Sequence, residues 1–85
     1  MALPGLFSLE GELVSLRIAV DPKHLEDLLE ALALLDFPVN PQLYHRPGEV
    51  TVEFPAYSGR VVEVGDAIRN HGFNPETLEV CRILS

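Results

Sequence analysis

The hydrophobic residues of this chain change their spacing at Asp21-Pro22, and this change constrains the fold more than any other feature. Over residues 12–20 the apolar side chains alternate, which is typical of a β-strand with one buried face. Over residues 25–35 the leucines lie three or four positions apart and form the stripe of an amphipathic helix. Asp can cap the free backbone N–H groups of a helix and Pro suits its first position, so the strand is expected to pass into a helix here.

Two further strands are expected after this helix, joined as a hairpin. Residues 39–46 and 49–54 flank a Pro47-Gly48 turn. Pro41 has no backbone N–H, so the first of these strands is expected at a sheet edge or paired only in its outer half. Pro55 is expected to end the second strand.

A second helix and a last strand complete the pattern. The helix is expected to start at Ser58-Gly59 and to end at Asn70-His71-Gly72-Phe73, where Gly72 suits the left-handed position and Phe73 can pack back on the last turn. Residues 77–84 read as a strand. Both faces of that strand are partly apolar, so its orientation stays open.

The order β-α-β-β-α-β predicts an α+β fold, the ferredoxin-like sandwich, with a four-stranded antiparallel sheet and two helices on one of its faces. Right-handed crossovers give the strand order 4-1-3-2. This single domain is expected over residues 12–85, after an irregular lead-in over residues 1–11. The same order predicts that Arg17 lies between Glu53 and Glu79 on the sheet face without helices.

Charge and composition disfavour several classes of partner. The 85 residues carry a net charge of −7, and the six basic residues form no cluster. Nucleic acids and anionic membranes are therefore not expected as partners. No apolar run could span a bilayer and no signal peptide stands out, which indicates a cytoplasmic protein. A single Cys excludes an internal disulfide, so a second copy of the chain is the expected source of extra stability in a domain this small.

The reactive side chains do not form a recognisable catalytic or metal-binding pattern. His24, His45 and His71 lack the spacing of a helical or finger-type metal site. Cys81 is expected to pack as a small hydrophobic residue within the last strand. Nucleophile-elbow and phosphate-loop motifs are missing. The sequence therefore predicts no catalytic residue, no metal, no cofactor and no enzyme activity, and a small enzyme ranks behind both binding functions below.

Three stretches resemble the ACT domains, small ferredoxin-like modules that bind amino acids or similar effectors and usually pair with one another. The resemblance covers residues 12–84 and rests on Ala19-Val20-Asp21-Pro22, Leu34-Leu35-Asp36-Phe37-Pro38-Val39-Asn40 and Ile68-Arg69-Asn70-His71-Gly72-Phe73. ACT domains commonly have a Gly after the first strand, where Lys23-His24 stands here.

The resemblance implies a regulatory domain that binds an amino acid or a similar small effector at the interface of a homodimer. Carried over by position, its ligand-binding residues would be Asp21, His24, Val39 and Asn40. The alternative is a structural module for dimerisation or protein–protein interaction that needs no ligand. Ligand-induced thermal stabilisation would distinguish the two.

Overall fold

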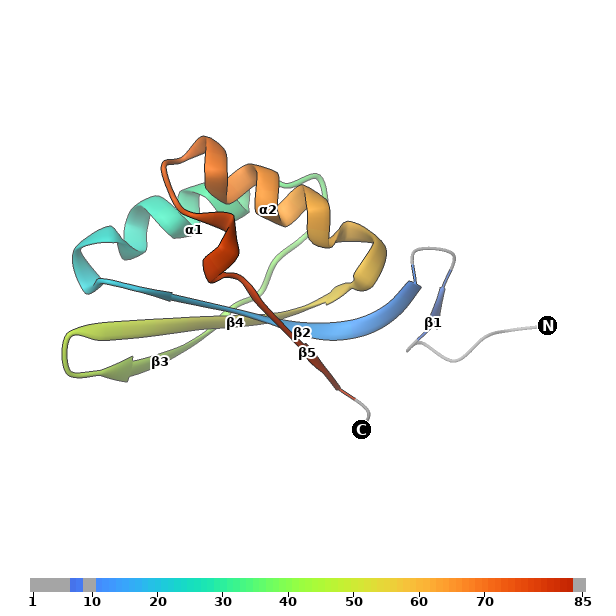
Figure 1. The fold of residues 1–85 in the computed structure, drawn as a ribbon, viewed down its shortest axis with the longest axis horizontal. Helices are drawn as coiled ribbons and strands as arrows, with labels where there is room; N and C mark the ends of the chain where they lie inside the picture. The colour runs from blue at the N-terminus through green and yellow to red at the C-terminus, as the bar shows by residue number, and fades with distance from the viewer. Residues whose placement is uncertain (1–6, 9–10, 84–85) are drawn as a thin grey trace.

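The computed structural model describes residues 7–8 and 11–83, which form one sheet and two main helices (Figure 1). The elements follow in the order β1 (Phe7–Ser8), β2 (Gly11–Val20), α1 (Leu25–Ala33), β3 (Gln42–Arg46), β4 (Glu49–Tyr57), α2 (Val61–Asn70) and β5 (Glu79–Arg82). Single 3₁₀ turns precede α1, α2 and β5, at Pro22–His24, Ser58–Arg60 and Pro75–Thr77.

The main sheet has four antiparallel strands in the spatial order β5-β2-β4-β3. Numbered along the chain, this is the predicted order 4-1-3-2. The longest pairing joins β2 to β4, from Leu13 opposite Tyr57 to Val20 opposite Val50. Both helices lie on the same side of the sheet, and no described helix covers its other side, which we call the open face (Figure 1). The predicted α+β architecture is therefore confirmed.

The hydrophobic core lies between the sheet and the two helices. Its residues come from alternate positions of β2 and β4 and from one face of each helix, as the two periods predict. Its buried members are Val14, Leu16, Ile18, Val20, Leu28, Leu32, Val50, Val52, Phe54, Ala56, Val64 and Ile68. No charged or polar residue is buried in the described part of the chain. The described core therefore stabilises the fold and contains no polar or charged side chain that could act in chemistry.

The ends of the helices follow the expected signals. Asp21 accepts a hydrogen bond from the backbone N–H of Lys23 and caps the turn that leads into α1. At the end of α2, Gly72 has a φ of 88°. The N–H of Phe73 donates to the carbonyl of Ile68, and the N–H of Gly72 donates to the carbonyl of Arg69. This is the predicted left-handed ending, and Phe73 packs on the core.

The hairpin differs from its prediction at both ends. Residues 39–41 are not paired, and β3 begins only at Gln42. The prediction that Pro55 ends its strand is wrong, because β4 continues to Tyr57. β3 pairs with β4 only as far as Glu53, so the segment around Pro55 is paired with β2 alone. A residue without an N–H is tolerated at such an edge.

The last strand is shorter than predicted, and its orientation is now defined. A 3₁₀ turn occupies Pro75–Thr77, and β5 spans Glu79–Arg82. Val80 lies opposite Leu16, a core residue, and therefore points to the helix side. Glu79 and Cys81 consequently point to the open side.

The lead-in contains a short element that the sequence did not reveal. Within the segment predicted to be irregular, Phe7–Ser8 form the two-residue strand β1, which pairs with the first two residues of β2. Residues 1–6 and 9–10 lie outside the described residues. No helix in the described ranges is long and apolar enough to cross a membrane.

Candidate functional site

The open face of the sheet carries a row of charged side chains at its centre. In the observed register Arg17 on β2 lies opposite Glu53 on β4 and opposite Glu79 on β5. The predicted placement of Arg17 between the two acids is therefore confirmed. It follows from the strand order and from the alternation of inward and outward side chains.

An ion pair joins the first two of these residues. Nε of Arg17 donates to Oε2 of Glu53 over 2.5 Å. The Glu53 side chain is 18% exposed and that of Arg17 is 49% exposed. The hydrogen bond from Arg17 lowers the pKa of Glu53 below its ordinary value, against the opposing effect of desolvation, and Ser15 lowers it further. Glu53 is thus held in its charged form.

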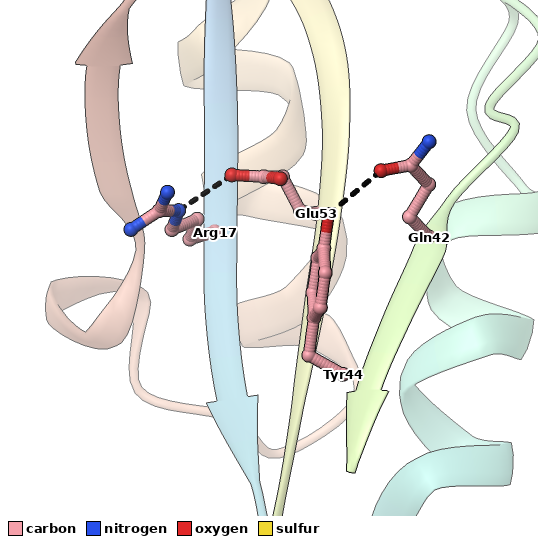
Figure 2. Close-up of polar contacts among 4 residues, drawn as sticks. All are labelled: Arg17, Gln42, Tyr44 and Glu53. Carbon is pink, nitrogen blue, oxygen red and sulfur yellow. Dashed lines mark hydrogen bonds and ion pairs between the residues drawn. The ribbon is translucent and has the colours of Figure 1, made fainter.

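Two residues of the edge strand β3 extend this polar surface. The register places Gln42 opposite Glu53 and Tyr44 opposite Thr51, so both side chains share the open face. The Tyr44 hydroxyl donates to Oε1 of Gln42 over 2.8 Å. Figure 2 shows the two pairs side by side, with Glu53 between Arg17 and Tyr44. The centre of the open face is therefore an ordered polar surface.

A shallow depression of about 790 Å³ lies over this surface. Its lining contains two guanidinium groups, three carboxylates and one phenol, together with smaller side chains and the β3 edge. The lining residues are Arg17, Ala19, Leu43, Tyr44, His45, Arg46, Glu49, Thr51, Glu53, Thr77 and Glu79. Groups of both charges that lie this close together can bind a small ligand that itself carries both charges.

The residues predicted from the ACT resemblance do not meet in one place. Asp21 and His24 follow the end of β2, whereas Val39 and Asn40 precede the start of β3. β3 begins at the level of Arg17, so Asp21 lies roughly 13 Å along the strand direction from the first residue of β3. Asp21 serves as a cap, Val39 packs against the core, and none of the four lines the depression.

The other reactive side chains are dispersed. Cys81 is partly exposed on the open face of the edge strand β5, opposite Ser15. His24, His45 and His71 lie on three separate elements or turns and are exposed. Nowhere in residues 7–8 and 11–83 do three His, Cys, Asp or Glu side chains come together in a way that could hold a metal ion.

Comparison with known proteins does not point to a site in this chain. No protein-family model, curated protein or solved structure matches the chain. Function must therefore be argued from the depression itself.

The residues of the depression could be found in part from the sequence. Alternation and strand order are sufficient to place Arg17, Glu53 and Glu79 on one face. Tyr44 was missed, because its face depends on the register of the edge strand, and the proline at the start of the predicted strand obscures that register. The available signal was the two-residue turn. Tyr44 lies three residues before Pro47 and Thr51 lies three residues after Gly48, so the two pair and share one face.

Proposed function

We propose that this chain is a small regulatory domain of the ferredoxin-like class, similar to ACT domains, that binds an amino acid or a similar small effector. The strand order β5-β2-β4-β3 with both helices on one face supports this class. The effector would bind in the depression on the open face rather than at the four loop residues that the resemblance implies. The net charge of −7 supports a domain without nucleic-acid or anionic-membrane partners, and a cytoplasmic setting is part of the same proposal.

The depression is the observation that carries this proposal. An amino acid has a carboxylate and an ammonium group a few ångströms apart. Arg17 and Glu79 face each other on neighbouring strands at the depression, so they offer a matching pair of opposite charges. Tyr44 adds an aromatic ring at its margin, 47% exposed.

A homodimer is proposed as the form in which the domain works. The depression is shallow, and a second copy over or beside it would enclose a ligand that one copy leaves half exposed. All five residues of β3 are exposed, and that strand pairs on one side only among the described strands. An edge of this kind can join a second chain through its free backbone groups.

Thermal unfolding in the presence of each of the twenty L-amino acids tests the proposal. A ligand that binds only the folded state raises the melting temperature, by an amount that grows with its concentration. At least one amino acid is expected to do so, with sodium acetate at the same ionic strength as the control. If none of the twenty raises the melting temperature above the acetate control, the proposal is wrong.

The second candidate is an interaction module without a ligand. Exposed apolar side chains favour it, namely Leu43 on β3 and Val80 on β5, the two outer strands of the main sheet. Sedimentation velocity would then show a stable dimer with no amino acid present. A monomer at all concentrations would exclude this candidate and also the homodimer proposed above, whereas thermal stabilisation by an amino acid would still support ligand binding.

A further inference from the structure

We propose that Arg17 is the residue that binds the effector's carboxylate, that Glu79 binds its ammonium group, and that Glu53 fixes the orientation of Arg17. This inference rests on the proposed function and specifies the chemistry of the same depression. It assigns roles to three residues that the loop-based prediction left out.

The hydrogen bonding of Arg17 leaves most of its donors available. A guanidinium group has five N–H donors, one on Nε and two on each terminal nitrogen. Only Nε donates to Glu53. In Figure 2 the guanidinium group lies on the side of β2 where β5 lies, and its two terminal nitrogens carry no dashed line to Glu53. Arg17 lines the depression, and its terminal nitrogens, which are not used by Glu53, can bind a carboxylate with two parallel hydrogen bonds.

Glu79 is placed to bind the second group of the ligand. It lies opposite Arg17 in the register, is exposed and lines the depression. Among the described residues, Glu53 is the only ion-pair partner of Arg17, and Glu79 acts on Arg17 only through space. A ligand whose carboxylate meets Arg17 would bring an adjacent ammonium group towards this carboxylate.

Glu53 is a positioning residue. Its side chain is less exposed than that of Arg17. It accepts a hydrogen bond from Arg17, and Ser15 and Tyr44 also interact with its carboxylate. A long, flexible Arg side chain loses conformational entropy when it binds a ligand. Anchoring Nε in advance removes part of that cost, because the side chain is already held in one conformation beside the depression.

The roles are tested by calorimetric titration with the L-amino acid that stabilises the wild type most and with its 2-oxo acid, which lacks the ammonium group. R17Q is expected to weaken amino-acid binding by about tenfold or more, since it removes a charged hydrogen-bond donor. The matched control R69Q removes an exposed guanidinium from α2, on the helix side of the sheet and outside the depression, and is expected to change affinity less than about twofold. Unliganded melting temperatures check that both variants fold.

Comparing the affinities for the amino acid and for its 2-oxo acid shows whether Glu79 binds the ammonium group or has only a structural role. Wild type is expected to bind the amino acid more tightly than its 2-oxo acid, and E79Q is expected to lose most of that preference. Binding by R17Q that equals wild type, with the wild type binding amino acids, would overturn the inference and leave the proposed function standing. Binding of inorganic phosphate in place of amino acids would overturn both.

Two substitutions of Glu53 isolate its positioning role. E53Q and E53A both remove the negative charge, but only Gln keeps an oxygen that can accept from Nε of Arg17. E53A is therefore expected to bind the amino acid several-fold more weakly than E53Q, in line with the loss of one hydrogen bond. Equal affinities of these two variants would overturn the positioning role.

Discussion

Arg17 and Glu53 face each other across the β2–β4 pair and are joined by a hydrogen bond of 2.5 Å from Nε to Oε2. The strand register brings them together from positions far apart in the chain. The bond occupies Nε and leaves the two terminal nitrogens of a residue that lines the depression without a bond to Glu53. The same contact therefore links the fold to the proposed ligand site.

The lowered pKa of Glu53 predicts a dependence of stability on pH. Its ordinary value is 4.5, and the hydrogen bond from Arg17 depresses it in the folded state. The contribution of the ionised group is thus complete above 4.5 and is lost as the pH falls through the lower, folded-state value. Urea unfolding of wild type and E53Q should give a difference in stability that is constant near neutral pH and shrinks under acid conditions. A difference that grows on acidification would contradict this account.

The tight core predicts a large cost for truncating its central aromatic residue. Phe54 is 1% exposed between the sheet and the helices. Phe54→Ala should lower the free energy of unfolding by about 3–5 kcal/mol. Leu43→Ala, at a position that is 38% exposed on β3, should cost less than about 1 kcal/mol. Urea unfolding measures both changes, and a similar cost at the two sites would show that the core is not where the structure places it.

Replacing Gly11, the first residue of β2, is predicted to destabilise the fold more than replacing Gly48. The φ of Gly11 is 104°, and an added Cβ would lie 2.2 Å from Oγ of Ser58, whose hydroxyl accepts the N–H of Glu12. Gly11→Ala therefore combines backbone strain with a clash. Gly48 has a φ of 76°, and a Cβ added there would meet nothing within 4 Å. Gly48→Ala should therefore cost only the backbone strain, about 1–2 kcal/mol of stability. The melting temperature of Gly11→Ala should be well below that of Gly48→Ala. The reverse order would contradict the close contact between Gly11, at the start of β2, and Ser58.

Asp21 is predicted to act in stability rather than in binding. Its Oδ1 accepts from the N–H of Lys23. Asp21→Ala should reduce stability by about 0.5–2 kcal/mol, whereas Asp21→Asn keeps the acceptor and should cost less. Titration of both variants with the stabilising amino acid should give wild-type affinity. Loss of affinity in Asp21→Asn, which preserves the cap, would return the ligand site to the loop.

Much of the fold could be predicted because each local signal was strong. Alternation over residues 12–20 and 49–54, together with the order of elements, is enough to set Arg17 beside Glu53. The helix end at Gly72 could be predicted since only a residue without a side chain adopts the left-handed conformation at no cost.

The parts that were missed depend on tertiary pairing. Whether Pro55 ends its strand depends on where β3 stops pairing, which no local pattern encodes. The separation of Asp21 from Asn40 likewise depends on the register of an edge strand. The direction of the free nitrogens of Arg17 is side-chain geometry, so the sequence could place the residue on the open face but could not assign it a role.

The location of the ligand site can be measured directly by NMR. Titrating ¹⁵N-labelled protein with the L-amino acid that stabilises it most shows which backbone amides change. The account predicts that the largest changes cluster at Arg17, Thr51 and Glu79, and that the Arg17 side-chain Nε–H signal shifts with them. Changes centred instead on His24 or Asn40, with the open face unaffected, would contradict it.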